Sequence, residues 1–513
     1  MQQKWSATLS GMITSSAILR SSLVHGGMQS RRDCDDHKSK MSSQASKVIN
    51  LLRGAFHEGV LHSIASRKTA LRAIVRMMEE NEDAIMEALM KDLHRPKHET
   101  LEAEILPIIL EANLMLSNID AWTKDEYTQR TFLSVLDTTY IQREPYGMVL
   151  IFGSWNYPFL LVITPLIGAI AAGNTAVIKP SEFSPASSSL IAQLVHKYLD
   201  ERVCQVLEGD VEFSQRLLKE ERFDYIFFTG SYEAGRSVYL AAADHVTPVT
   251  LELGGKCPSY VDSSVSMTMA VKRILFTKLM NAGQTCVATD YILCHKDSMA
   301  ALRETVCRIL KEFLGDDPKE STSFSRIVNE RHFKRLTHLL ANTRGKILCG
   351  GESSEEDLYV APTVLVNVPK DDVSMREEIF GPILPIVEVE SAAEAIEFIS
   401  SKNKPLAVYV YTDDANVFAN FKHGTSSGAI CQNDSCSYLL LSQLPFGGVG
   451  SSGFGNYHGR FSLETFSHKR SVHVKSRMEV IYEKFAYPPY TPEKLGWARW
   501  LLSSSERSSC TLL

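Results

Sequence analysis

The chain has 513 residues, 44% of them hydrophobic and 22% charged, and a formal net charge of -6. This length allows two or three domains, because a single hydrophobic core stops growing at about 250–300 residues. A nucleic-acid partner would need a concentrated basic face, and the negative net charge argues against one.

Residues 1–32 contain no acidic side chain, many serines and four basic residues. This composition resembles a mitochondrial transit peptide. We favour the alternative, an unstructured extension over residues 1–42 or a downstream start at Met28 or Met41. The ten cysteines are scattered with no CxxC pair, which fits a reducing compartment and argues against disulfides and structural zinc.

Helical patterns extend from residue 44 to about residue 126, with apolar residues three and four apart in 70–90 and 103–119. Residues 131–143 then alternate in polarity and predict an extended segment.

Residues 145–178 carry no charge and are long enough to span a membrane. Their asparagines, prolines and glycines instead indicate a soluble fold punctuated by turns. We predict a buried strand at 148–152, a loop and a core helix at 159–172.

Strand-like apolar runs alternate with helical patterns between residues 147 and 253. Ser184 and Pro185 begin one helix, with serine as the N-cap and proline at the first helical position. The alternation predicts a parallel sheet with helices on both faces, a nucleotide-binding architecture. The predicted strands are 148–152, 175–178, 202–207, 225–228 and 249–253.

The usual GxGxxG fingerprint is absent, and Gly230-Ser-Tyr-Glu-Ala-Gly235 takes its place between a predicted strand and a helix. Such a turn presents backbone N–H groups and a helix N-terminus to a phosphate. By pattern alone it is equally an ordinary strand–helix turn.

A second α/β unit begins after Gly254. The glycines of residues 447–455 predict a mobile, turn-rich loop. The predicted helices of this unit are 267–279, 299–314 and 330–341, and its strands are 363–366, 384–389 and 406–411.

Three side chains are candidates for catalysis. Cys286 lies in the run NAGQTC after a predicted helix, where a thiolate could attack a substrate, although an arbitrary cysteine is more often a buried hydrophobe. Glu252 ends an apolar strand before a Gly-Gly turn, so poor solvation should raise its pKa and suit a general base. Asn156 offers an amide that can hold an oxyanion.

Seven motifs along the chain resemble, in order and spacing, those of the aldehyde dehydrogenase superfamily over about residues 45–475. Details such as NAGQTCV and EEIFGPILPIV are similar to the class 3, fatty-aldehyde branch. Thr289, where that branch usually has proline, and Cys257 depart from the pattern. The motifs are WNYP (155–158), IKPSE (178–182), FTGS (228–231), ELGGK (252–256), GQTC (283–286), EIFGP (378–382) and PFGG (445–448).

The resemblance implies a doubly wound, Rossmann-like NAD domain, an α/β catalytic domain and a small bridging sheet that pairs subunits of a homodimer. The expected divisions are an extension at 1–42, the NAD domain at 43–125 and 148–254, the catalytic domain at 255–443, the bridging segments at 126–147 and 444–478, and a tail at 479–513.

The resemblance also assigns cofactor contacts. Lys179 and Glu182 would hold the adenosine ribose, and a carboxylate there favours NAD over NADP, although NADP could also be used. Glu378 and Phe380 would hold the nicotinamide ribose and flank the ring, and Gly230, Ser231 and Gly235 would line the phosphate turn.

The implied reaction is NAD(P)-dependent oxidation of medium- to long-chain aliphatic aldehydes. Cys286 adds to the carbonyl, Asn156 and the Cys286 backbone N–H hold the oxyanion, and Glu252 activates water to hydrolyse the thioester. Nothing in this chemistry needs a metal. The alternatives are a semialdehyde or acyl-CoA-forming dehydrogenase, or a catalytically silent structural protein of the same fold.

The chain ends in Cys510-Thr-Leu-Leu513, a C-a-a-X box whose leucine favours a geranylgeranyl anchor at Cys510. A second membrane signal is usually needed. Thr491 and Pro492 can begin a helix that places Trp497, Trp500 and Leu501 on one face. We expect the cytoplasmic face of a lipid droplet or another membrane, with the plasma membrane as the alternative. If the tryptophans pack on the catalytic unit, this expectation fails.

Overall fold

The computed structural model describes residues 44–131, 134, 136–478, 482–484 and 486–505. The chain divides into two compact units, residues 1–48 and residues 49–513, and every labelled element named below belongs to the second. The predicted extension at 1–42 and the lipidation candidate Cys510 lie outside the described residues.

The predicted nucleotide-binding sheet has six strands in the order β17-β7-β6-β3-β4-β5. All are parallel except β17, which runs antiparallel to β7. Every residue of β3 and β4 is buried, which explains why β3 is an uninterrupted apolar run and why β4 is apolar between Thr175 and Lys179. The strands are β3 Met148–Phe152, β4 Thr175–Lys179, β5 Cys204–Val206, β6 Tyr225–Gly230, β7 Val249–Leu253 and β17 Gly453–Phe454.

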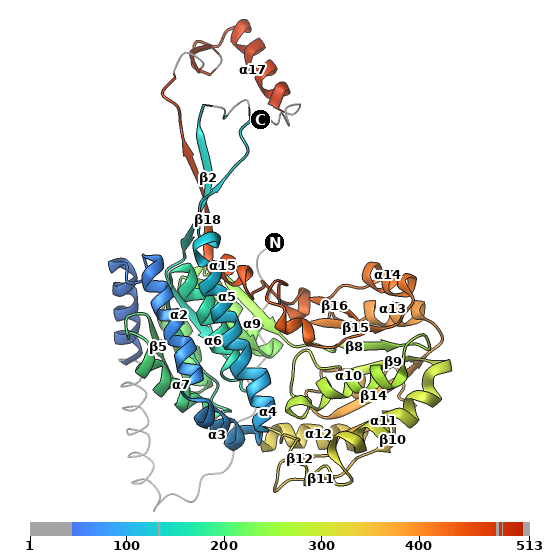
Figure 1. Ribbon diagram of the computed structural model, residues 1–513. Coiled ribbons are helices and arrows are strands. Elements are labelled where there is room, and N and C mark those ends of the chain that lie inside the picture. Colours follow the sequence, from blue (N-terminus) through green and yellow to red (C-terminus); the bar gives the residue numbers. More distant parts are fainter. Residues whose placement is uncertain (1–43, 132–133, 135, 479–481, 485, 506–513) are drawn as a thin grey trace, which may run out of the picture. The chain divides into compact units, whose positions relative to one another are not determined.

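Helices that precede β3 in the chain, and helices that connect the strands, pack against this sheet (Figure 1). The predicted helical pattern over 70–90 is two helices that break at Asn81, and the uncharged stretch forms β3 and α6 as expected. No described helix is long and apolar enough to cross a membrane. The helices are residues 44–58, α2 Ile64–Glu79, α3 Glu82–Leu93, α4 Lys97–Thr100, the π-helix η1 Leu101–Ile105, α5 Leu106–Trp122, α6 Leu160–Ala172, α7 Pro185–Tyr198, α8 Val211–Glu220 and α9 Tyr232–His245.

The helix predicted to begin at Pro185 does so, but its cap differs from the prediction. The Ser184 side chain makes no capping hydrogen bond. The carboxylate of Asp92 instead accepts from the backbone N–H groups of Ala186 at 3.0 Å and Ser187 at 2.7 Å. An acidic group from another helix therefore satisfies the orphan donors of α7.

The second sheet has seven strands in the order β10-β13-β14-β9-β8-β15-β16. Only β10 is antiparallel to its neighbour. The strands are β8 Pro258–Val261, β9 Tyr291–His295, β10 Lys346–Cys349, β13 Thr363–Val366, β14 Ile383–Val389, β15 Ala407–Tyr411 and β16 Ala429–Gln432, beside a small ribbon of β11 Ser353–Ser354 and β12 Tyr359–Val360.

The helices around this sheet begin and end close to the predicted bounds where a prediction was made. They are α10 Met267–Leu279, η3 Met280–Gly283, η4 Lys296–Ser298, α11 Met299–Leu314, α12 Glu330–Asn342, η5 Val373–Met375, α13 Ala392–Ser400, α14 Ala415–Gly424 and η6 Ser437–Leu440. Two later helices belong with the first sheet, because η7 Gly450–Ser452 contacts β7 and α15 Arg460–Thr465 contacts α6. The boundaries of the NAD, catalytic and bridging domains stay a prediction.

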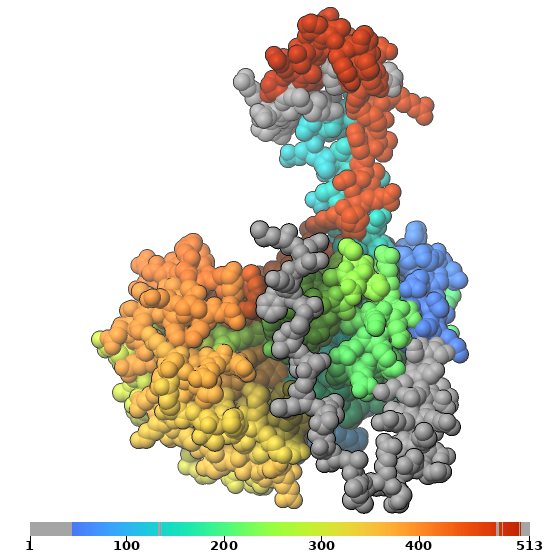
Figure 2. All heavy atoms as spheres, turned by 180° about the vertical axis from the view of Figure 1, so that it is seen from behind, coloured from blue at the N-terminus to red at the C-terminus, as the bar shows by residue number. Residues whose placement is uncertain are grey.

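A third, three-stranded sheet joins β1 (Glu126–Tyr127), β2 (Thr138–Pro145) and β18 (Ser467–Val474). The extended segment predicted at 131–143 becomes regular only at Thr138, and part of it lies outside the described residues. Figures 1 and 2 both show β2 and β18 as a projecting ribbon with the tail helix α17 (Pro492–Ser505) at its far end.

Candidate active site

Cys286 lies in the loop that follows α10 and η3. Within η3, Asn281 and Ala282 both have left-handed backbone conformations, at φ 52° and 51°. A side chain at Gly283 would collide with the carbonyl oxygen of Gly381, so the glycine lets two loops approach closely. Residues 281–283 therefore hold an uncommon backbone shape just before the candidate nucleophile.

The side chain of Gln284 holds the loop that carries Cys286 through hydrogen bonds to backbone groups around it. Its amide nitrogen donates to the carbonyl oxygens of Asn281 at 2.9 Å and Arg326 at 3.0 Å. Its amide oxygen accepts from the backbone N–H of Val328 at 3.0 Å. The glutamine of the GQTC motif is thus a structural residue that fixes the loop.

Asn156 is buried between β3 and α6, and its side-chain amide donates to the backbone carbonyl of Gln284 at 3.0 Å. This bond places the amide beside the loop, two residues before Cys286. An amide nitrogen carries two N–H groups, so one remains for an oxygen near the thiol. The structure brings Asn156 and the Cys286 loop together.

Glu252 lies on β7 with its carboxyl group buried, and neither carboxyl oxygen has a hydrogen-bond partner among the described residues. Burial raises the pKa of this carboxyl well above its ordinary value, as the sequence predicted. Burial also raises the pKa of the Cys286 thiol, with added contributions from the carboxylates of Glu378 and Glu252. Glu252 and Cys286 therefore lie within each other's electric field.

The glycine-rich segment 447–455 is turn-rich as predicted, but it also contains a strand. In β17, Gly453 lies directly opposite Glu252 in an antiparallel pair with β7. At φ 121°, Gly453 brings its backbone so close to Leu251 that a side chain would collide with the Leu251 carbonyl oxygen. The turn-rich segment therefore also contributes an edge strand to the first sheet, because glycine permits this close strand pairing.

Glu378 packs against the Gly-Gly turn that follows Glu252. The backbone N–H of Gly255 donates to its carboxylate, and a side chain at Gly254 would collide with that carboxylate. Burial and the nearby Asp290 raise the pKa of Glu378 to about 8, against the opposing effects of the Gly255 hydrogen bond and two basic side chains. The motifs ELGGK and EIFGP, far apart in the sequence, thus meet at one place.

Phe380 has a left-handed backbone conformation, at φ 48°, and its ring meets that of Trp155 edge-on, with centroids 5.4 Å apart. Its loop is held by Arg335, which donates to the carbonyl oxygen of Ile379 at 2.6 Å. Asp290 accepts from the backbone N–H of Ile379 at 3.1 Å. These contacts fix an aromatic ring beside the WNYP motif.

Lys256, the last residue of ELGGK, is a structural residue that the sequence reasoning did not single out. Its ammonium group pairs with Asp290 and donates to the carbonyl oxygens of Ser374 at 2.8 Å and Glu377 at 2.9 Å. A buried second lysine, Lys278, lies 3.8 Å from Asp290. This network of ion pairs and hydrogen bonds holds the loop of the EIFGP motif in place.

The predicted cofactor residues lie at the carboxyl ends of β4 and β6. Lys179 is buried and its ammonium lies 2.8 Å from the carboxylate of Glu182. β6 ends at Gly230, and the hydroxyl of Ser231 caps α9 by accepting from the N–H of Ala234 at 3.3 Å. Carboxyl ends of parallel strands are where α/β sheets bind ligands.

Gly235 has a packing reason to be glycine, because a side chain there would collide with Leu253 of β7. The hydroxyl oxygen of Thr229, next to Gly230, is buried with no hydrogen-bond partner among the described residues. A buried donor without a partner at this edge of the sheet fits a site that receives a polar ligand.

Cys257 and Thr289, the two departures from the family pattern, both contact the nucleophile region. Cys257 is buried, and its thiol donates to the backbone carbonyl of Cys286 at 3.4 Å. The buried hydroxyl of Thr289 lies 2.7 Å from that of Ser259 on β8. Both side chains are therefore satisfied in the fold, and neither contact blocks the thiol of Cys286.

Tyr409 and Cys436 also hold the nucleophile loop and were missed from the sequence. The Tyr409 hydroxyl donates to the carbonyl oxygen of Val287 at 2.6 Å, and the Cys436 thiol donates to the same oxygen at 3.3 Å. Neither residue lies in a motif. Their contact with the Val287 carbonyl becomes visible only in the fold, which brings Tyr409 of β15 and the later residue Cys436 beside the Cys286 loop.

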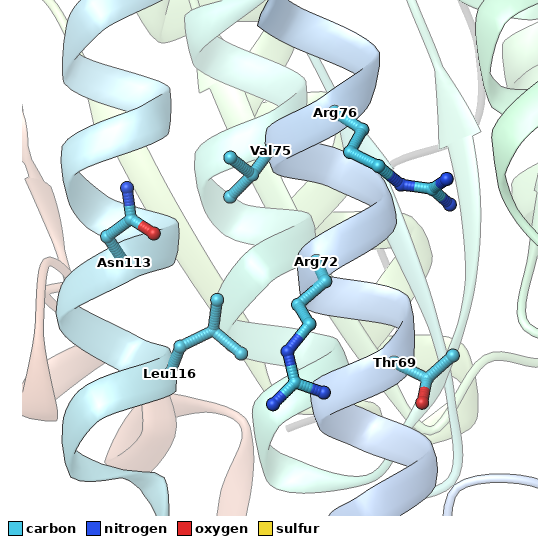
Figure 3. A pocket seen from close by; sticks show the side chains of 6 residues that line it. All are labelled: Thr69, Arg72, Val75, Arg76, Asn113 and Leu116. Atoms are coloured by element: carbon cyan, nitrogen blue, oxygen red, sulfur yellow. The ribbon is translucent and has the colours of Figure 1, made fainter.

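A cavity of about 420 Å³ lies apart from these residues, between α2 and α5 (Figure 3). None of the predicted site residues lines it. Its lining residues are Thr69, Arg72, Val75, Arg76, Asn113 and Leu116.

Comparison with known proteins gives the same assignment over nearly the whole chain. Residues 34–472 match the model described as "Aldehyde dehydrogenase family". The curated protein aldehyde dehydrogenase family 3 member B1 of Bos taurus is 46% identical over 465 residues, covering 90% of this chain and 98% of its own. Family 3 member A2 of Pongo abelii is 44% identical over 454 residues, covering 88% and 93%.

Solved structures agree with the observed fold. The substrate-bound AldH of Staphylococcus aureus superposes with a TM-score of 0.86 at 40% identity, covering 89% of this chain and 99% of that one. PnpE in complex with nicotinamide adenine dinucleotide superposes with a TM-score of 0.76 at 26% identity, covering 83% and 88%.

Proposed function

The chain belongs to the aldehyde dehydrogenase family and is an NAD(P)-dependent oxidoreductase acting on aldehydes, and we propose that its substrates are medium- to long-chain aliphatic aldehydes. The observation that carries the catalytic assignment is the buried, unpartnered carboxyl of Glu252 in the electric field of Cys286. Fold stability alone gives no reason to bury such a group, since an unpaired carboxyl destabilises the folded state.

The residues present fit a dinucleotide. The Lys179–Glu182 pair can exchange its internal contact for ribose hydroxyls, and the N-terminus of α9 with Ser231 faces the strand end where the Thr229 hydroxyl has no hydrogen-bond partner in the described part of the chain. Glu378 and Phe380 are held beside Glu252 for the nicotinamide end. NAD(P) supplies the hydride acceptor of the oxidation.

Cys286 supplies the nucleophile of the first step. Its raised pKa keeps the thiol neutral until positive charge reaches it or a neighbouring base takes its proton. When sulfur adds to the aldehyde carbon, the negative charge develops on the former carbonyl oxygen. The free N–H of Asn156 and the backbone N–H of Cys286 would donate to it, and one such donor is typically worth ~3–4 kcal/mol.

Glu252 acts in the second half of the reaction. Oxidation of the thiohemiacetal leaves a thioester on Cys286, and water must then attack its carbonyl carbon. A carboxylate with a raised pKa is a stronger base than an exposed one, and Glu252 has both oxygens available to take a proton from water. The products are the carboxylic acid and the free thiol.

Aromatic side chains around the thiol support an aliphatic substrate. Tyr157 hydrogen-bonds Thr285 at 2.7 Å, and Trp155 packs on Phe380. Tyr457 is buried, and the charges of Glu252 and Cys286 raise its pKa in addition to burial. Aromatic side chains of this kind favour the apolar hydrocarbon chain of an aliphatic aldehyde over a charged semialdehyde.

A chain-length series tests this proposal. We expect kcat/KM for NADH formation to rise from propanal to long saturated aldehydes, and Cys286→Ala to abolish turnover while NAD still binds. Cys204→Ala, at a buried cysteine of β5, is the matched control. A preference for succinic semialdehyde, or product formation that requires coenzyme A, would support the enzyme alternatives. Activity retained by Cys286→Ala would remove the nucleophile assignment.

The tail supports a proposal of membrane attachment. Helix α17 begins as predicted, with Thr491 accepting from the N–H of Lys494 at 3.2 Å. Trp497 and Trp500 are 42% and 50% exposed, whereas Leu501 is 6% exposed. The shared face of Trp497, Trp500 and Leu501 stays a prediction, and the two tryptophans are its exposed members. The exposed tryptophans and prenylation at Cys510 would together hold the enzyme at a lipid droplet or the plasma membrane.

We also propose a homodimer. The sheet of β2 and β18 projects from the body of the second unit, where its edges are accessible to a second copy. Sedimentation analysis of the full chain tests this, and a monomer at micromolar concentration would contradict it.

A further inference from the structure

Arg95 follows α3 and is fully buried, although no motif singles it out. Its guanidinium lies 2.7 Å from the carboxylate of Glu104 and 3.3 Å from that of Glu99. It also donates to the backbone carbonyl of Asn156 and lies over the ring of Tyr157, 4.6 Å from the centroid. In the interior this one side chain therefore makes two hydrogen bonds, to Glu104 and to the Asn156 carbonyl, an ion pair with Glu99 and a contact with an aromatic ring.

The carboxylates of Glu99 and Glu104 in turn accept hydrogen bonds from the backbone near Asn156 and near Cys286. Glu104 accepts from the N–H of Leu160, the first residue of α6, at 2.7 Å. Glu99 accepts from the N–H of Asn281 at 2.7 Å, at the start of the turn that leads to Cys286. Asn281 also connects the two loops directly, because its side-chain amide donates to the backbone carbonyl of Asn156 at 2.9 Å.

The local structure is built to make these contacts. Glu104 lies in the π-helix η1, whose wider turn redirects side chains relative to a regular α-helix. Burial raises the pKa values of both Glu99 and Glu104 to about 7, and the charge of Arg95 acts against this. A planar guanidinium can bond in several fixed directions at once, which a lysine ammonium on a flexible stem does less well.

We propose that Arg95 is a positioning residue for catalysis, which fixes the Asn156 amide relative to the Cys286 loop through Glu99, Glu104 and the Asn156 carbonyl. This inference rests on the oxyanion role proposed for Asn156. The contacts of Arg95 within the described part of the chain are with Glu99, Glu104, Tyr157 and the Asn156 carbonyl and not with the thiol or the carboxyl of Glu252, so its effect is expected on the first chemical step and not on coenzyme binding.

Pre-steady-state NADH formation in the full-length enzyme tests the inference. Arg95→Met should slow the burst on the order of 10–100-fold, the size expected when a catalytic group is misplaced by about 1 Å. The KM for the aldehyde and the Kd for NAD should change less than threefold. Arg95→Lys should recover part of the burst rate, because lysine keeps the positive charge. The recovery should be incomplete, because lysine lacks the planar, forked guanidinium.

A matched control separates positioning from loss of stability. Arg67 is a half-buried arginine that also donates to backbone carbonyls, those of Leu61 at 2.7 Å and Ala171 at 3.0 Å, away from Cys286. Arg67→Met should lower Tm without slowing the burst. If Arg95→Met does not fold, Arg95→Lys and Glu99→Gln carry the test, since both keep a side chain of similar size.

A double-mutant cycle with Asn156→Ala distinguishes the possible failures. If Arg95 acts through Asn156, Arg95→Met should add little to the slowing already caused by Asn156→Ala. A burst that Asn156→Ala leaves unchanged would overturn the proposed oxyanion role. A burst slowed by Asn156→Ala, but not by Arg95→Met or its conservative variants, would overturn only the positioning role. Additive effects would likewise overturn action through Asn156.

Discussion

The ammonium of Lys179 and the carboxylate of Glu182 form an ion pair 2.8 Å apart at the carboxyl end of β4. Lys179 is buried, whereas the Glu182 side chain is about one-third exposed and reaches toward solvent. The pair therefore presents one neutralised lysine and one carboxylate where the adenosine ribose is proposed to bind.

Glu182→Ala should shift the coenzyme preference toward NADP. The change removes a carboxylate that repels a 2′-phosphate and frees the charge of Lys179 to attract it. We expect the ratio of kcat/KM for NADP to that for NAD to rise on the order of tenfold, which equals about 1.4 kcal/mol. Glu201→Ala, at an exposed carboxylate, is the control. An unchanged ratio would mean that Glu182 does not face the ribose.

Glu252→Gln should separate the two halves of the reaction. Without a base for water, the thioester should accumulate after hydride transfer, so NADH should appear as a burst followed by a slow phase. The steady-state rate should fall on the order of 10²–10⁴-fold, the usual contribution of a general base. Quenched-flow measurement checks this. Equal slowing of both phases would assign Glu252 to an earlier step.

The same variant should change how stability depends on pH. The pKa of Glu252 is raised in the folded state, so its ionisation opposes folding. Stability from this group is fully present below the unfolded pKa, about 4.3, and is lost as the pH rises toward the folded value. The Tm of Glu252→Gln relative to wild type should therefore increase between pH 5 and pH 8.5. An equal Tm difference at both pH values would contradict the raised pKa.

The tail prediction concerns two separate signals. Cys510→Ser should release the enzyme to the cytosol, because one prenyl chain is the main anchor. Trp497→Ala with Trp500→Ala should reduce lipid-droplet labelling while prenylation persists, since these exposed rings would insert at the interface. Leu106→Ala with Leu110→Ala removes comparable exposed apolar surface on α5 and is the control. Imaging in lipid-loaded cells measures all three, and unchanged distribution of the cysteine variant would exclude the anchor.

The strands that the sequence predicted best are those with uninterrupted apolar runs. β3 begins and ends at the predicted residues because all five of its residues are apolar and glycines flank it, and β7 does so although Thr250 and Glu252 interrupt its apolar residues. The short edge element β17 could not be predicted, since Gly453 and Phe454 have no strand pattern of their own. Its existence depends on β7, which is distant in the sequence.

The candidate site divides in the same way. Cys286, Glu252 and Asn156 lie in motifs with recognisable chemistry, so sequence reasoning could find them. Arg95 and Tyr409 are isolated in the sequence, and their importance arises from contacts made across the fold. Tertiary partners of this kind carry no local signal.

The ladder between β2 and β18 joins Thr138–Pro145 to Ser467–Val474, segments separated by more than three hundred residues. During synthesis, β2 must wait until the ribosome has made almost the whole described chain before its longer partner is available. A growing chain emerges at about 5–20 residues per second, so β2 exposes an open edge for roughly 15–65 seconds. An exposed edge can pair with other chains. Nascent molecules of this enzyme should therefore depend on a chaperone that shields β2 until translation ends.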